Sequence, residues 1–317
     1  MKTYTLEFEK PIRELEHKIK ELNDLGHSGD IDVRTDIKRL KTKIDKLRKR
    51  IFSKLSRWQT VQLARHPQRP YTMDYVNRIF DEFIELHGDR MFRDDKAIIS
   101  GIGKIGNRGI AMIGHQKGRG TKDNLYRNFA MPHPEGYRKA LRVMKLAEKF
   151  GLPVLTLIDT PGAYPGIGAE ERGQAEAIAS NLYEMAQLKV PIIAIVIGEG
   201  GSGGALALGV ADRVFMLQYA IYSVISPEGC ASILYRDASH AKEAAEAMKI
   251  TSNDLLAGKI IDGIIEEPLG GAHCDFDQMA ANLSAKIIST IDELMSIDSG
   301  DLVNRRLDKY ASMGIWK

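Results

Sequence analysis

Hydrophobic residues in the first sixty positions recur every three or four residues, the spacing of one face of an α-helix. The first set is Ile12, Leu15, Ile19 and Leu22. The second set is Val33, Ile37, Leu40, Ile44, Leu47 and Ile51, and its alternating steps of four and three resemble a heptad seam. Turn-forming residues at 25–30 separate the two sets. This pattern predicts an antiparallel helical hairpin, whose apolar seams pack on each other, on the rest of the chain, or on another subunit.

The hairpin region ends at a segment that contains two prolines. Pro67 and Pro70 close the segment 65–70, and proline disfavours the helical conformation in the residue before it. We therefore expect two domains, a helical hairpin over residues 1–70 and a second domain over residues 71–317. The apolar spacing after the boundary predicts a further helix from Met73 to His87.

Beyond residue 87, short apolar and β-branched runs alternate with helical stretches. The predicted strands are Ala97–Ile105, Ile110–His115, Val154–Ile158, Ile192–Ile197, Val214–Leu217 and Tyr222–Ile225. The predicted helices are Pro134–Phe150, Glu170–Leu188, Gly203–Val210, Phe276–Met295 and Ser299–Lys309. Fully apolar strands separated by helices are typical of an α/β fold in which both faces of the sheet are covered.

Composition narrows the class of protein. The apolar fraction of 44% is ample for a core, and two distant cysteines, Cys230 and Cys274, exclude a four-cysteine zinc site. The shortage of cysteines also argues against a disulfide framework and favours a reducing compartment. No apolar run approaches the roughly 18 residues of a membrane span, and residues 1–10 lack the apolar core of a secretory signal. We therefore expect a cytoplasmic protein that is not associated with a membrane.

Positive charge is concentrated in one segment of a chain whose net charge is only +3. Residues 38–57 contain ten Lys or Arg and a single acid, Asp45. Such a segment can bind nucleic acid or an acidic partner, but it is also the usual composition of a solvent-facing helix. We favour the solvent-facing helix and leave nucleic-acid binding open.

Two glycine-bearing segments follow neighbouring predicted strands and precede predicted helices, at 159–168 and 198–204. The first turn of a helix offers backbone N–H groups without intrahelical acceptors, and glycine lets a ligand approach them closely. We expect amides of the two segments to converge into an oxyanion hole, a set of donors that stabilises developing negative charge on oxygen. The expected donors are Gly203, Gly204, Gly162 and Ala163.

Other motifs overlap the second segment. Gly198, Gly200 and Gly203 match the spacing of a dinucleotide fingerprint, but the unit lies late in the fold and the next strand ends without an acid. A phosphate-binding P-loop is excluded because no Gly-Lys-Ser/Thr follows the glycines. Ser202 stands in a Gly-x-Ser-x-Gly nucleophile motif, which leaves a serine hydrolase as the alternative function. Its downstream partners would come from Asp212, His240 and His273, whereas Ser202 also suits a helix N-cap.

Several of these segments together are similar to a known family. The stretch 159–174, DTPGAYPGIGAEERGQ, resembles a signature of the carboxyltransferase alpha subunit of bacterial acetyl-CoA carboxylase. The segments 198–207, 226–231, 114–119, 134–140 and 64–72 resemble the same family. The resemblance covers nearly the whole chain, and the glycine segments show no departure from the family pattern.

The resemblance implies a crotonase-like fold, a spiral of ββα units, and a heterotetramer with a beta subunit (α2β2). It implies transfer of a carboxyl group from carboxybiotin, on a biotin carboxyl carrier protein, to acetyl-CoA, giving malonyl-CoA in the first step of fatty acid synthesis. Biotin carboxylase belongs to the wider ATP-dependent complex. No cofactor or metal is expected on this chain, and zinc is expected only on the beta subunit.

The resemblance also guides the choice of substrate-binding candidates. Gly200 and Gly201 belong to the glycine segment itself, and Tyr164 is a candidate wall of the biotin pocket. Lys117, Arg119 and Arg138, with Lys122 and Arg127, are candidates for contacts with CoA phosphates or the transferred carboxylate. His115, at a predicted strand end, is interpreted as a hydrogen-bonded core residue.

Overall fold

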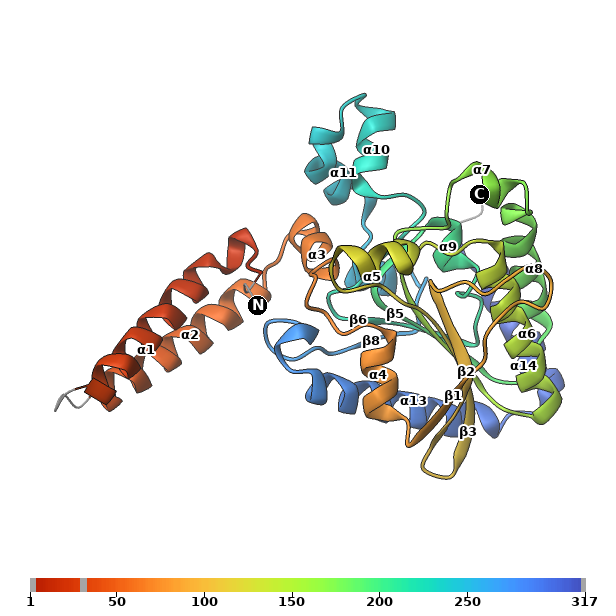
Figure 1. The fold of residues 1–317 in the computed structure, drawn as a ribbon, viewed down its shortest axis with the longest axis horizontal. Helices are drawn as coiled ribbons and strands as arrows, with labels where there is room; N and C mark the ends of the chain where they lie inside the picture. Colours follow the sequence, from red (N-terminus) through yellow and green to blue (C-terminus); the bar gives the residue numbers. More distant parts are fainter. Residues whose placement is uncertain (1–3, 29–32, 315–317) are drawn as a thin grey trace.

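The computed structural model describes residues 4–28 and 33–314. Within these ranges the chain forms a helical hairpin that projects from a larger α/β body, with the hairpin at the left of Figure 1. The hairpin consists of α1 (Lys10–Ser28) and α2 (Arg34–Phe52), preceded by the short 3-10 helix η1 (Glu7–Glu9). The seam of apolar residues packs helix on helix, and Phe52 joins Leu63 and Tyr219 of the body at its base. The apolar seams therefore pack on each other and on the rest of the chain, which are two of the three partners proposed for them.

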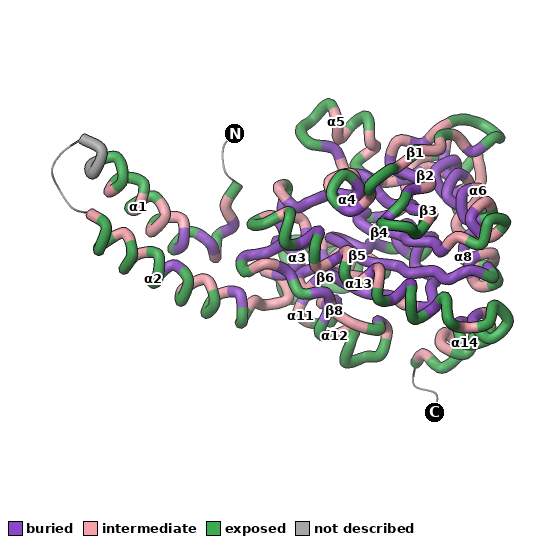
Figure 2. The backbone as a smooth tube through the Cα atoms, turned by 90° about the horizontal axis from the view of Figure 1, so that it is seen from below, coloured by how far each residue is buried: buried purple, intermediate pink, exposed green. Residues whose placement is uncertain are grey.

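The body is built on one mixed sheet of eight strands within the described residues. Its strands are β1 (Glu82–Glu85), β2 (Ile98–Ile105), β3 (Arg108–His115), β4 (Val154–Thr160), β5 (Ile192–Gly201), β6 (Arg213–Leu217), β7 (Ile221–Ser223) and β8 (Gly263–Ile265). The first three strands pair antiparallel, and the rest of the order, β3-β4-β5-β6-β8, is parallel. β7 pairs in parallel with the carboxyl-terminal end of β5, at Glu199–Gly201. Every residue of β4 and β5 is buried, as their apolar sequences predict (Figure 2).

Further helices surround this sheet or project from the body (Figure 1). They are α3 (Arg57–Ala64), α4 (Thr72–Ile79), α5 (Gly120–Tyr126), α6 (Pro134–Phe150), α7 (Ile167–Glu170), α8 (Gln174–Gln187), α9 (Ser202–Leu206), α10 (Pro227–Leu234), α11 (Ala241–Met248), α12 (Ser252–Ala257), α13 (Phe276–Met295) and α14 (Ser299–Ala311). Short 3-10 turns are η2 (Asn128–Ala130), η3 (Ala238–His240) and η4 (Ala272–Cys274). α6 packs on β2 and β3, and α13 packs on β5 and β8. No described helix combines the length and apolarity that crossing a bilayer requires.

Several sequence predictions of secondary structure were wrong in their bounds. The helix predicted over Gly203–Val210 ends at Leu206, and the strand predicted over Tyr222–Ile225 ends at Ser223. The helix predicted over Met73–His87 ends at Ile79, and the chain continues as β1. The helix predicted over Glu170–Leu188 is interrupted at Gly173, whose φ of 81° lies in the left-handed region, so that α7 and α8 are separate. The turn expected at 25–30 begins later, because α1 continues to Ser28, while residues 29–32 lie outside the described ranges.

The early end of α4 has a cause in the neighbouring strand. A Cβ added at Gly103 would lie 2.3 Å from the Phe80 ring, and one added at Gly101 would lie 2.7 Å from the Phe83 ring. The two glycines therefore leave space for two aromatic rings (Phe80 and Phe83), which form an edge-to-face pair with centroids 5.9 Å apart. Burial of these rings against β2 favours the extended chain over a continued helix.

Candidate functional site

The glycine segment 198–204 spans the end of a strand and the start of a short helix. Gly198 to Gly201 are the last residues of β5, and α9 begins at Ser202. Gly200 pairs with Thr160 of β4 on one side and with Tyr222 of β7 on the other, so Gly200 and Gly201 are held in the sheet. The predicted cap was wrong: Gly201 is the N-cap residue of α9, and Ser202 makes no capping hydrogen bond. Ser202 instead takes a left-handed φ of 54°, which turns the chain sharply from strand to helix.

The two glycine segments lie in direct backbone contact, as the sequence predicted. A Cβ added at Gly204 would lie 2.5 Å from the carbonyl carbon of Gly162 and 2.6 Å from the nitrogen of Ala163. A Cβ added at Gly201 would lie 2.3 Å from the carbonyl oxygen of Pro161. No side chain fits at either position without moving backbone. Glycine is therefore required here for close approach of the two segments.

The expected amide donors differ in their availability. The N–H of Gly162 donates to the Thr160 hydroxyl at 3.0 Å, and that hydroxyl donates to the Gly162 carbonyl at 2.7 Å, so the Gly162 amide is already engaged. Gly203 and Gly204 lie in the first turn of α9, where amides have no intrahelical acceptor. Gly203 is half-buried and Gly204 is buried against Ala163. The arrangement leaves the start of α9 as the better source of donors.

Buried charged residues connect the two glycine segments where each leaves its strand. Asp159, at the end of β4, accepts hydrogen bonds from Lys117 Nζ at 2.5 Å and from the Glu199 N–H at 2.9 Å. Gly198 is needed beside it, since a Cβ there would lie 2.4 Å from the Asp159 carboxylate. Burial alone would lower the pKa of the Lys117 ammonium, but the carboxylates of Asp159 and Glu199 outweigh burial and raise that pKa. Asp159 thus joins the first segment to the second.

A second set of ion pairs connects the glycine segment to α10. Arg65, which follows α3, contacts Glu199 at 2.6 Å and Glu228 of α10 at 2.7 Å. Sequence reasoning placed Lys117 only as a contact for phosphate or carboxylate and assigned no role to Asp159, Glu199 or Arg65. The one available signal was an acid, Asp159, directly after a fully apolar strand, because its partners lie far away in the chain.

The remaining basic candidates for substrate contacts do not line the pocket at the start of α9. Arg119 pairs with Asp74 at 2.6 Å, and its guanidinium stacks over Tyr71 with 4.5 Å to the ring centroid. Arg138 pairs with Glu176 of α8 at 2.9 Å. Of the further basic candidates, Arg127 lies 3.7 Å from Asp123, and Lys122 is exposed on α5.

Tyr164 and His115 lie in different surroundings. Tyr164 packs its ring on His133, with 4.3 Å between centroids. His115 is fully buried, and burial lowers its pKa to about 4, so it is neutral near neutral pH. The backbone of Gly204 lies beside the His115 ring and opposes this lowering of the pKa, although neither ring nitrogen makes a hydrogen bond of ordinary geometry to the described residues.

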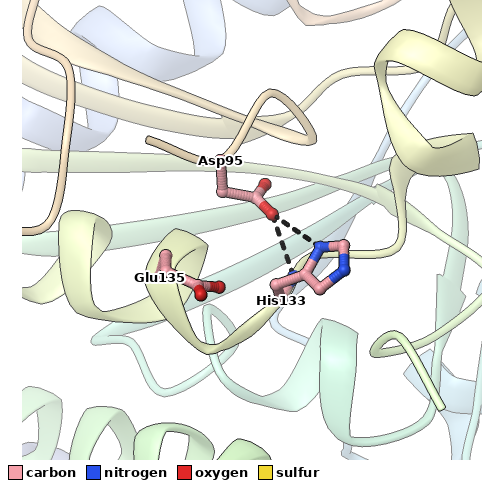
Figure 3. Close-up of side chains that lie close together, drawn as sticks. All are labelled: Asp95, His133 and Glu135. Atoms are coloured by element: carbon pink, nitrogen blue, oxygen red, sulfur yellow. Dashed lines mark hydrogen bonds and ion pairs between the residues drawn. The ribbon is translucent and has the colours of Figure 1, made fainter. Parts of the chain in front are cut away.

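His133 belongs to a cluster with Asp95 and Glu135, whose candidate ligand atoms lie within 4.8 Å of one another (Figure 3). The Asp95 carboxylate accepts from the His133 N–H at 3.0 Å and lies 3.2 Å from its Nδ1. Glu135 is ion-paired with Arg172, and Arg93 approaches it at 3.9 Å. These guanidinium groups balance Glu135, and Asp95 is engaged by His133 and by backbone N–H groups, so we assign no metal here. The cluster orients the His133 ring against Tyr164.

A pocket of about 540 Å³ opens beside the start of α9. Its volume is within the usual range for small-molecule sites. Apolar side chains from β7, α9, α12 and nearby loops form most of its wall: Leu206, Tyr222, Val224, Ile225, Ile250, Leu255 and Ile260. Ser202 and Gly203 are the parts of the glycine segment that line it. An apolar group entering this pocket would therefore meet the first turn of α9.

The hydrolase alternative finds no support in the positions of its partners. Asp212 is bound to Arg306 with 2.7 Å between charged atoms, and His273 stacks on His66 with centroids 3.9 Å apart. His240 lies 3.8 Å from Glu243. Among the described residues, none of these three groups contacts Ser202, and Ser202 has no general base beside it.

Comparison with known proteins gives one family, in agreement with the resemblance seen in the sequence. A family model described as acetyl co-enzyme A carboxylase carboxyltransferase-like matches residues 5–314. The acetyl-coenzyme A carboxylase carboxyl transferase subunit alpha of Geobacter metallireducens is 57% identical over 310 residues, covering 98% of this chain and 97% of the relative. The protein of the same name from Dichelobacter nodosus is 58% identical over 309 residues, with the same coverage.

Solved structures with the same fold are more distant in sequence. The transcarboxylase 12S hexamer core, determined with methylmalonyl-coenzyme A and methylmalonic acid bound, aligns with a TM-score of 0.59 and 19% identity. The alignment covers 72% of this chain and 42% of that chain. The beta subunit of geranyl-CoA carboxylase from P. aeruginosa aligns with a TM-score of 0.56 and 18% identity, covering 77% and 46%. These matches confirm the predicted crotonase-like carboxyltransferase fold.

Proposed function

Because the chain belongs to the family of acetyl-CoA carboxylase carboxyltransferase alpha subunits, we propose that its start of α9 is the place where carboxybiotin is activated. With a beta subunit, the chain transfers the carboxyl group from carboxybiotin to acetyl-CoA and forms malonyl-CoA. The observation that carries the proposed site is the backbone contact between Gly204 and the Gly162–Ala163 peptide. This contact brings the amide-rich start of α9 against the first glycine segment, 159–168.

The proposed chemistry begins at the bond between the ureido nitrogen and the carboxyl carbon. When this bond breaks, CO2 leaves and negative charge develops on the ureido nitrogen and oxygen. The N–H groups of Gly203 and Gly204 donate to that oxygen, with Ala163 as a further donor. Removing one such donor from an oxyanion hole typically costs 10²–10³ in kcat, about 2.7–4 kcal/mol.

The following steps need no base from this chain. The ureido nitrogen takes a proton from the acetyl methyl group, and the resulting enolate attacks CO2 to form the new carbon–carbon bond. We place the donors that stabilise the enolate on the beta subunit. The position of Ser202, without a base beside it, agrees with a mechanism that uses backbone amides rather than a side-chain nucleophile.

The apolar pocket beside Gly203 suits the fused rings and aliphatic arm of biotin. Its volume of about 540 Å³ accommodates such a group, and its wall is largely apolar. Gly200 and Gly201 pair with Tyr222 and Ser223 of β7, and this pairing fixes the position of the turn that leads into α9. Lys117 acts through Asp159 as a positioning residue, since its ammonium is committed to that carboxylate.

The assembly we propose follows the family. The chain forms a heterotetramer (α2β2) with the beta subunit, receives biotin from a biotin carboxyl carrier protein, and works beside biotin carboxylase in an ATP-dependent cytoplasmic complex for fatty acid synthesis. Zinc is assigned to the beta subunit and no cofactor to this chain. We do not assign nucleic-acid binding to the basic segment 38–57.

Reconstitution tests the proposal. The purified chain, a beta subunit, carboxylated biotin and acetyl-CoA are mixed, and malonyl-CoA is measured with both chains present and with each omitted. Malonyl-CoA forms only when both chains are present. Equal formation by the beta subunit alone would contradict a role for this chain.

A further inference from the structure

One charged side chain lines the apolar pocket beside Gly203. Among the described residues that form its wall, Lys249 alone carries a charge, and the others are apolar or neutral. Lys117 lies beside the glycine segments, but it does not line this pocket, and its ammonium is paired with Asp159 at 2.5 Å. A ligand that enters the pocket therefore meets a single cation, that of Lys249.

Backbone pairing fixes the position of Lys249 relative to the glycine segment. α11 ends at Met248, and Lys249 turns the chain with a left-handed φ of 54°. The carbonyl of the next residue, Ile250, accepts a hydrogen bond from the Tyr222 N–H of β7 at 3.1 Å, and Tyr222 pairs in turn with Gly200. Adjacent paired chains lie about 4.8 Å apart, so two such steps place Ile250 about 10 Å from Gly200. The long, flexible stem of Lys249 carries its ammonium across part of this distance.

The Lys249 ammonium is available to an anionic ligand. Within residues 4–28 and 33–314, no carboxylate forms an ion pair with it, and the side chain is exposed. The neighbouring acids of α11 have other partners. Glu246 lies 3.4 Å from Arg57, and Glu243 lies 3.8 Å from His240.

Carboxybiotin brings a negative charge to this pocket, because its ureido nitrogen carries a carboxylate. A carboxylate held in apolar surroundings without a cation or hydrogen-bond donors is strongly disfavoured. In the proposed site the amides of Gly203 and Gly204 are directed at the ureido oxygen, so the carboxylate needs a partner of its own. Lys249 is the cation in the wall that can fill this role.

The contact would act on binding rather than on bond cleavage. When the carbon–nitrogen bond breaks, its electron pair stays on the ureido group, and the carboxyl carbon leaves as neutral CO2. The attraction of the ammonium for the carboxylate is then lost. An interaction that is stronger before cleavage than during it tightens substrate binding without raising kcat.

We propose that Lys249 is a specificity-determining residue, whose ammonium binds the carboxylate of carboxybiotin and so makes the pocket prefer carboxybiotin to biotin. The inference rests on the proposed function, because it takes the pocket beside Gly203 as the biotin site. After transfer, biotin lacks the carboxylate and is held less tightly, which favours its release. Lys249 lies outside every segment that resembles the family, so the sequence motifs gave no indication of it.

Steady-state kinetics of the chain reconstituted with a beta subunit test this inference. The substrate is the carboxylated methyl ester of biotin, because the ester has no side-chain carboxylate to pair with Lys249. Lys249→Met removes the charge and keeps an apolar stem, so KM for this substrate rises at least tenfold while kcat stays within about twofold. Lys249→Arg keeps the charge and leaves KM within about threefold. Lys242→Met is the matched control: Lys242 is exposed on the same helix outside the pocket, and KM stays within about twofold.

Inhibition by the uncarboxylated methyl ester of biotin separates a charge effect from damage to the pocket. Its inhibition constant is unchanged in Lys249→Met if the lost contact is the one to the carboxylate. An equal rise of KM and of the inhibition constant overturns the inference, and so does an unchanged KM or a fall in kcat alone. Failure of the wild-type pair to form malonyl-CoA would instead contradict the proposed function, and the inference with it.

Discussion

Replacement of Gly204 by alanine changes the contact on which the proposed site depends. The new Cβ would lie 2.5 Å from the carbonyl carbon of Gly162 and 2.6 Å from the nitrogen of Ala163, whereas ordinary contacts begin at 3.4 Å. Backbone atoms surround this position, so no side-chain rotation relieves the clash. The two glycine segments must separate by about 0.9 Å, the difference between 3.4 and 2.5 Å.

A displacement of this size is large enough to lower the rate of the catalysed reaction. Misplacement of reacting groups by about 1 Å can lower a rate by about 10²-fold, which corresponds to about 2.7 kcal/mol. We therefore expect Gly204→Ala to lower kcat for malonyl-CoA formation by about a hundredfold. Overpacking also costs stability, typically 1–3 kcal/mol, so folding and assembly are checked by thermal unfolding and by gel filtration with the beta subunit.

Gly203→Ala is the matched control. A Cβ there has its nearest neighbour, Ile178 Cδ1, at 3.5 Å, which is an ordinary contact. The substitution keeps the backbone N–H, so kcat should stay within about threefold of the wild type. The reasoning is refuted if Gly204→Ala, folded and assembled, retains wild-type kcat, or if both substitutions reduce kcat equally.

Three further predictions test separate parts of the structure. Ser202→Ala keeps kcat within about tenfold, because no base lies beside this hydroxyl; complete loss in a folded, assembled protein would favour the hydrolase mechanism. Asp159→Asn leaves the Lys117 ammonium buried without its carboxylate, so urea unfolding should show a loss of about 3 kcal/mol, and an unchanged midpoint would contradict this role. Burial lowers the pKa of His66 to about 4 and that of His273 to about 3. The unfolded chain, with ordinary values of 6.5, therefore binds protons first, and stability should fall from pH 6.5 down to about 3, by on the order of 2 kcal/mol for each histidine at pH 5. His273→Phe should reduce this pH dependence in urea titrations, and an unchanged pH dependence would show that other groups cause it.

Local sequence patterns predicted the elements whose stability depends on local features. β4 and β5 were predicted from short runs rich in apolar and β-branched residues, and both are buried along their whole length. The hairpin was predicted from its heptad spacing, which persists from Val33 to Ile51 in and just before α2. The two glycine segments were expected to adjoin because parallel strands end at the same edge of a sheet, and their backbones are in contact.

Features that depend on distant residues were not predicted. The end of α4 is set by the space above Gly101 and Gly103, which lie on another strand. The assignment of Ser202 as a cap failed because the turn between β5 and α9 imposes a left-handed conformation on that residue. Lys117 and Asp159 are 42 positions apart, and no spacing rule in a single sequence joins them.

In the proposed site, backbone amides of the glycine segment 198–204 bind the ureido oxygen. A crystal structure of this chain with its beta subunit and bound biotin tests this directly. We expect the ureido oxygen 2.7–3.1 Å from the nitrogen of Gly203 or Gly204, the usual range for an oxyanion donor. A ureido oxygen bound instead by a side chain, or lying outside the pocket beside Gly203, would contradict it.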